Sequence, residues 1–147
     1  MEKYDLQRFL DAHNQAYLRA LSEVRSGKKE THWMWFIFPQ LKGLGKSDTA
    51  KFYAISDLPE AREYLAHPVL GRHLLEITRE LLKITDRTAG EIFGHADDLK
   101  LHSSMTLFAE AADGNSLFSK VIKHYFGGDK DLSTMLLLKN KMDNDAV

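Results

Sequence analysis

Apolar residues recur with the period of an α-helix along most of this chain, and this pattern restricts its fold more than any other feature. The clearest case lies between residues 6 and 24, where Gly27 follows closely enough to end the helix and Asp5 precedes it as a possible cap. The residues that share the apolar face are Leu6, Phe9, Leu10, His13, Tyr17, Ala20, Leu21 and Val24. Such a face must be buried, so this segment is predicted to be a helix of a packed domain.

Capping residues predict further helices, with Ser47, Asp57 and Thr88 each placed to begin one. The remaining helices are expected at residues 47–53, 57–66, 68–82, 88–93, 97–112, 117–126 and from about 131 to 138. Only residues 33–38 offer an alternation of period two, and one strand cannot make a sheet. The prediction is therefore an all-α fold, a single compact domain of about six to eight helices. The domain should span residues 1–139, with a flexible polar tail at 140–147.

Length and composition exclude several classes of function. The 147 residues suit one domain, and a formal charge of −1 gives no overall field for nucleic acid or an anionic membrane. The chain has no cysteine, no apolar run long enough to span a bilayer and no metal-binding pattern among its histidines. We expect a soluble cytoplasmic protein without metal, cofactor, nucleic-acid or membrane partner, and the sequence leaves open whether it has a protein partner.

The segment Thr31–Gln40, THWMWFIFPQ, concentrates both tryptophans of the chain, two phenylalanines and a histidine. Rings of this size are either buried in the core or used in a binding site. His32 has an aromatic neighbour in Trp33, so its ring is a candidate acid, base or hydrogen-bond donor, or else a cover for the aromatic cluster. The segment is thus predicted to be core, a site wall, or both.

A glycine-rich turn follows the aromatic segment and imitates a phosphate-binding P-loop. The P-loop pattern requires a glycine where this chain has Gln40, and no strand ending in aspartate follows to hold magnesium, so a nucleoside triphosphatase is not supported. A weaker prediction remains: Lys42, Gly43, Gly45 and Ser47 can cradle a phosphate or carboxylate at the start of a helix. The alternative is a plain turn with solvated lysines.

The predicted helix at 97–112 has polar residues where an apolar face is expected. Ser104 falls inside the apolar arc and Lys100 lies near its edge. A buried hydroxyl or ammonium group is costly without partners, so one interpretation is a built pocket. The other is that Lys100 extends to solvent and Ser104 bonds to its own helix carbonyl. His13, on the apolar face of the first helix, is interpreted as a satisfied core residue.

Several motifs occur in order along the chain: HWMWFIFPQ, the turn at 43–45 with Ser47, YLAHP at 64–68 with Leu70-Gly71, and IFG at 92–94 leading to Asp98, Lys100 and SSMTLF at 103–108. Together they resemble the bacterial domain-of-unknown-function family numbered 1810, which is sometimes labelled calpastatin. The resemblance runs from about Asp5 to Leu138 and implies a compact all-helical domain without an established activity. His13 stands where the family leads us to expect glutamine, which argues against catalysis by that histidine.

Polar side chains beside stacking rings suggest a site for a small anionic ligand, such as a nucleotide or an ADP-ribose-like molecule. No catalytic residue is identified. The candidate binding residues are His32, Trp33, Trp35, Gln40, Lys42, Gly43, Gly45, Ser47, His67, Asp98, Lys100, Ser103, Ser104 and Thr106. The alternative is a non-catalytic protein-interaction module whose aromatic segment is structural core. An open cleft that joins His32, Lys100 and Ser104 would favour the ligand site, whereas fully packed tryptophans and a satisfied Ser104 would favour the module.

Overall fold

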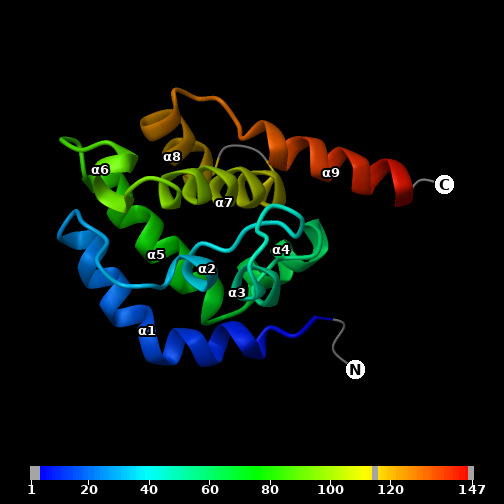
Figure 1. Ribbon diagram of the computed structural model, residues 1–147, viewed down its shortest axis with the longest axis horizontal. Helices are drawn as coiled ribbons and strands as arrows, with labels where there is room; N and C mark the ends of the chain where they lie inside the picture. Colours follow the sequence, from blue (N-terminus) through cyan, green and yellow to red (C-terminus); the bar gives the residue numbers. More distant parts are fainter. Residues whose placement is uncertain (1–3, 114–115, 146–147) are drawn as a thin grey trace.

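The structure of the protein is a computed structural model that describes residues 4–113 and 116–145. The described residues form an all-α domain without a β-strand, and a single bridge joins Leu41 to Ile55. The helices are α1 Gln7–Arg25, α2 Met34–Ile37, α3 Asp48–Phe52, α4 Leu58–Ala66, α5 Leu70–Lys83, α6 Ala89–Phe93, α7 Asp97–Ala112, α8 Leu117–Phe126 and α9 Leu132–Asp145 (Figure 1).

The prediction of six to eight helices was too low, because the described residues form nine. The additional helix is α2, which occupies the segment that offered the only candidate strand. Its backbone groups bond within the segment, from Ile37 N to the Trp33 carbonyl and from Phe38 N to the Met34 carbonyl, each at 3.1 Å. A strand here would have needed a partner, and Pro39 follows immediately to stop a longer helix.

Local capping chemistry explains where most of the other helices begin. The side chains of Ser47, Asp57 and Thr88 accept backbone N–H bonds at the starts of α3, α4 and α6, as predicted. Asp5 does not cap α1, whose N-cap is Leu6 without a side-chain bond. At the other end of the chain, residues 140–145 continue α9, although a tail was predicted from residue 140. Residues 146–147 lie outside the described part, and the flexibility of the tail stays a prediction.

The central element of the core is α7, which is buried around most of its surface. It packs against α4, α6, α8 and α9, while α5 contacts α1, α4 and α8. Figure 1 shows α1 along one side of the molecule and α7 to α9 along the other, with α5 crossing between them. Aromatic contacts tie these layers together: the rings of Phe9 and Tyr64 meet edge to face at 5.1 Å, and Tyr64 also contacts Phe108 at 5.4 Å. None of the described helices is long and apolar enough to cross a membrane.

Candidate functional site

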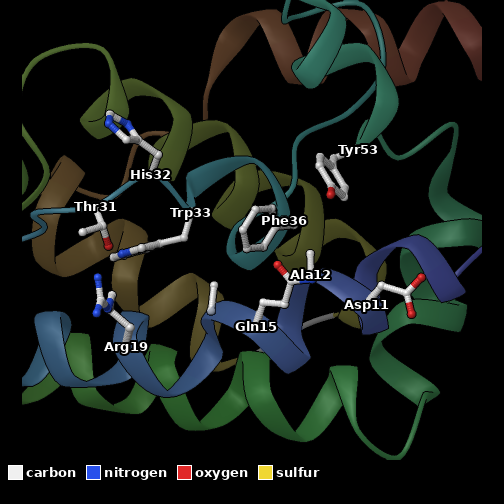
Figure 2. Close-up of a pocket in the computed structure, with 10 residues that line it drawn as sticks. Asp11, Ala12, Gln15, Arg19, Thr31, His32, Trp33, Phe36 and Tyr53 are labelled. Carbon is white, nitrogen blue, oxygen red and sulfur yellow. The ribbon is translucent and has the colours of Figure 1, made fainter.

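A groove of about 470 Å³ runs between α1 and the segment that leads from α1 into α2. Its size is in the range of sites that hold metabolites and drug-like molecules. Figure 2 shows its lining, which consists of Asp11, Ala12, Gln15, Ala16 and Arg19 from α1, Thr31, His32, Trp33 and Phe36 from the following segment, and Tyr53 after α3.

The helical period of α1 determines which of its residues reach the groove. Residues 12 and 15 are each followed by residues three or four positions later, at 15, 16 and 19, so all four share one helix face. A neighbouring face carries Phe9, His13, Tyr17, Ala20 and Val24, all buried in the core. Helix α1 therefore stabilises the domain with one face and supplies the groove with the next.

Buried Glu23 holds the opposite wall of the groove in place. Its Oε1 accepts hydrogen bonds from the backbone N–H groups of Glu30 and Thr31 at 2.6 and 2.9 Å and from Trp33 Nε1 at 2.9 Å. Its Oε2 accepts a bond from the Thr31 hydroxyl at 2.6 Å. Burial raises the pKa of this carboxyl, but the hydrogen bonds from Thr31, Glu30 and Trp33 outweigh burial and lower the pKa to about 2. Glu23 is therefore charged at neutral pH and orients Thr31 and Trp33.

Charged side chains stand at both ends of the groove, with rings between them. In Figure 2 the guanidinium of Arg19 points toward Thr31 and the indole nitrogen of Trp33, while Asp11 lies at the far end, beyond Phe36. Arg19 is exposed and makes no ion pair with any described residue, whereas Asp11 accepts a hydrogen bond from Gln7 at 2.8 Å. The rings of Phe36 and Tyr53 contact each other at 5.2 Å, tilted by 57°.

The described lining of the groove offers several kinds of contact for a ligand. Behind it, Glu23 accepts a bond from the Thr31 hydroxyl and has a carboxyl pKa of about 2, which makes Glu23 a poor general base near neutral pH. The described residues contain no group of three or more histidine, aspartate or glutamate side chains placed to hold a metal ion. The available interactions are hydrogen bonding, charge attraction and ring contact.

Of the residues predicted from the sequence, His32 and Trp33 line the groove. His32 is exposed, whereas Trp33 is only 1% exposed. Trp35 lies elsewhere, half-buried beneath Lys100, whose Nζ is 5.5 Å from the ring centroid. The remaining candidates do not line the groove: Gln40, Lys42, Gly43, Gly45, Ser47, His67, Asp98, Lys100, Ser103, Ser104 and Thr106.

An ion-pair network explains the position of Lys100. Asp97 binds Lys29 and Lys100, each at 3.0 Å, and the ammonium of Lys29 also lies 5.1 Å from the Trp33 ring centroid. Burial raises the pKa of Asp97, but the hydrogen bonds from the two lysines outweigh it and hold that pKa below its ordinary value. Lys100 thus joins α7 to the aromatic segment rather than facing the groove.

The predicted anion cradle at residues 42–47 has structural contacts in this fold. The backbone amide of Lys42 donates to the Ile55 carbonyl at 2.7 Å, and the Ile55 amide donates to the Gln40 carbonyl at 2.8 Å. Ser47 caps α3, a helix of five residues. Gly43 has φ +108°, and a Cβ on Gly45 would lie 2.4 Å from that of Ala50. Both glycines are therefore required by the turn itself.

The other predicted polar residues also bond within the chain, with one exception. His67 Nδ1 accepts hydrogen bonds from the backbone amides of residues 69 and 70 at the start of α5. The Asp98 carboxylate accepts a hydrogen bond from the backbone amide of residue 99. The Ser103 hydroxyl donates to the Leu99 carbonyl and to the Asp131 carboxylate. The backbone amide of Asp131 in turn donates to the Thr106 hydroxyl. Ser104 is fully buried and has no hydrogen-bond partner in the described part of the chain. The bond to its own helix carbonyl, one of the two interpretations left open for Ser104, is absent there; Ser103 makes such a bond instead.

Sequence reasoning missed Asp11, Gln15, Arg19, Phe36 and Tyr53 as groove residues. Asp11, Gln15 and Arg19 lie on an exposed helix face, where polar residues are the rule, and no local pattern separates a groove from a solvated surface. Phe36 belongs to the aromatic segment that the prediction identified, which was the one available signal.

Comparison with known proteins gives the same fold and no named activity. The crystal structure of the conserved hypothetical protein Rv1873 from Mycobacterium tuberculosis is similar, with 48% sequence identity, a TM-score of 0.91 and coverage of 94% of this chain and 99% of that one. The curated proteins contain no match. Residues 3–138 match the family described as "Protein of unknown function (DUF1810)". The resemblance noted from the motifs is therefore confirmed, and the chain belongs to this family of proteins of unknown function.

Proposed function

We propose that this protein binds a small anionic metabolite in the groove between α1 and the aromatic segment, with an ADP-ribose-like nucleotide as the leading class of ligand. Arg19 carries the proposal, because its guanidinium faces the groove beside Thr31 and Trp33 without an ion pair to any described residue (Figure 2). Guanidinium groups bind phosphate and carboxylate groups through paired, charge-assisted hydrogen bonds. The absence of cysteine suits the reducing cytoplasm, where we place this activity.

The rest of the groove supports a ligand larger than a free phosphate. Its 470 Å³ exceeds the space that a lone phosphate needs. The partly exposed rings of Phe36 and Tyr53 offer apolar area for a base or sugar, and Asp11 at the far end can accept hydrogen bonds from amino or hydroxyl groups. An anionic group at Arg19 and a ring system over Phe36 would use both ends at once.

Thermal shift with four probes tests the proposal: ADP-ribose, AMP, adenosine and inorganic phosphate. At 100 times Kd a ligand stabilises its protein by about 2.7 kcal/mol, which raises Tm by roughly 5–10 °C for a chain of this size. We expect ADP-ribose or AMP to raise Tm and adenosine to do so weakly. If no phosphorylated probe changes Tm, the proposal is wrong.

Matched variants locate the binding site. Arg19→Gln removes one exposed charge and should weaken binding about 10- to 100-fold with little change in the Tm of the free protein. Arg79→Gln removes another exposed arginine, from α5 and outside the groove, and should leave Kd unchanged. Lys100→Gln tests the anion site predicted from the sequence. Loss of affinity in Lys100→Gln with retention in Arg19→Gln would move the site away from the groove.

The second candidate, a non-catalytic interaction module, is favoured by one observation. Trp33, Met34, Ile37 and Phe38 are each at most 2% exposed, so most of the aromatic segment is structural core. The probes separate the two functions, since a module of this kind should show no saturable response to any nucleotide.

A further inference from the structure

Two histidines from α1 and α5 face each other behind the wall of the groove. Their Nδ1 atoms are 2.9 Å apart, and the rings are parallel within 4°. His13 is 3% exposed, while His73 is partly exposed and stacks on the Tyr17 ring with centroids 3.6 Å apart. The groove does not use this pair, and the sequence indicated only that His13 is a core residue.

The hydrogen bonds of the pair determine where its protons lie. The Phe36 carbonyl can only accept, so His13 Nε2, at 2.9 Å from it, must carry a hydrogen. In the neutral ring His13 Nδ1 is then a bare acceptor, and His73 Nδ1 must donate to it. The remaining lone pair belongs to His73 Nε2. Tyr64 donates to the same carbonyl at 3.3 Å, so Phe36 is held from two sides.

Proton counting shows that the pair responds differently to a first and a second added proton. The first proton binds His73 Nε2 and leaves every hydrogen bond of the pair intact. The second must bind His13 Nδ1, which already faces an N–H group, so the Nδ1···Nδ1 bond between α1 and α5 has to break. The two rings would then be like charges with centroids 5.2 Å apart.

The surroundings of the pair oppose its protonation. Burial, followed by the like charges of His73 and His67, lowers the pKa of His13 to about 4, although the bond to Phe36 raises it. Burial and Arg72 lower the pKa of His73, and Glu76 opposes that effect. The titratable and charged groups that face the pair are Tyr17 from α1, Tyr64 from α4, His67 between α4 and α5, and Arg72 and Glu76 from α5.

We propose that His13 and His73 form an acid-sensitive latch: their Nδ1···Nδ1 hydrogen bond persists with no added proton or one, and it breaks when the second proton binds. The two helices stay joined by the bonds of Tyr17 to the His73 carbonyl and of Arg25 to Glu80, so the latch changes the local contact and not the packing of α1 as a whole. The latch acts on the groove because the His13 ring also holds the carbonyl of Phe36, a wall residue. It is a property of the unliganded chain, so its test requires no ligand and is independent of the proposed function.

Nitrogen-15 NMR of histidine-labelled protein tests the latch on the unmodified chain. At pH 7 we expect the Nε2–H form of His13 and the Nδ1–H form of His73. On acidification His73 should protonate first, at Nε2, with His13 following only near pH 4. The Phe36 carbonyl carbon shift should move with the His13 step and not with the His73 step. Opposite tautomers at pH 7, or a Phe36 shift that ignores His13, would overturn the proposal.

A variant separates the latch from simple burial. His73→Phe keeps a ring against Tyr17 but removes both the N–H donor and the neighbouring charge. The pKa of His13 should then rise by at least about 1 pH unit, because the neutral form loses its donor and the cation loses a repelling partner. His95→Gln, at an exposed histidine between α6 and α7, should leave the titration of His13 unchanged. An unchanged His13 pKa in His73→Phe would show that burial alone is responsible.

Discussion

Replacing Glu23 by glutamine should destabilise the protein in a pH-dependent way. The side chain keeps its shape and its Oε1 acceptor, but it loses the negative charge that four hydrogen bonds stabilise. A carboxyl pKa that falls from 4.5 in the unfolded chain to about 2 in the folded one corresponds to about 3 kcal/mol of stability at neutral pH. Glu23→Gln should therefore lower the free energy of unfolding by about that amount at pH 7.

The sign of the pH dependence follows from the direction of the shift. Because the folded pKa lies below the unfolded value, the contribution of Glu23 is complete above about pH 5 and is lost as the pH falls from 4.5 toward 2. The difference in unfolding free energy between the unmodified chain and Glu23→Gln should shrink to about 1 kcal/mol at pH 3. Other carboxylates titrate in both proteins, so their effects cancel in this difference.

Urea unfolding followed by tryptophan fluorescence at pH 7, 5, 4 and 3 measures the difference. Glu63→Gln is the matched control, because Glu63 is exposed on α4; its effect should stay within about 0.5 kcal/mol at every pH. Two results would refute the reasoning. One is a Glu23→Gln effect as small as that of the control at pH 7, and the other is an effect that does not shrink between pH 5 and pH 3.

Three further predictions concern packing and buried polar groups, each measured by urea unfolding at pH 7. Gly71→Ala should cost about 2 kcal/mol or more, because its Cβ would lie 2.0 Å from the Leu65 carbonyl oxygen. Gly90→Ala should be neutral or stabilising, because its Cβ would lie 3.6 Å from Asp98 Oδ2; equal effects of the two changes would contradict this. Ser104→Ala should be neutral or stabilise by up to about 1 kcal/mol, since its buried hydroxyl has no partner among the described residues; a clear loss would reveal an unrecognised bond. Tyr125→Phe should lower the free energy of unfolding by about 1 kcal/mol, because the Tyr125 hydroxyl donates to the carbonyls of Leu81 and Ile84 at 2.5 and 3.3 Å. An unchanged stability would show that these bonds are replaced by water.

Helices and their ends were readable from sequence because their causes lie within a few residues. The caps at Ser47, Asp57 and Thr88 lie where predicted, and so does the buried face of α1. The prediction failed at α2, where four residues are too few to show a helical period. At Ser104 the pattern left two interpretations open, because whether a buried hydroxyl finds a partner depends on atomic positions that a helical wheel does not contain.

Residue order alone indicated the all-α class, most helix boundaries, the family, and an aromatic segment that had to be core, a site wall, or both. Periodicity, capping and large apolar rings are local causes, so the residue order is enough to reveal them. The packing of the helices is what places Arg19 beside Thr31 and Trp33 at a groove, and His13 beside His73, 60 positions later in the chain. These contacts depend on how α1 packs against α5 and on the path of the chain into α2, and neither can be predicted from a local sequence pattern.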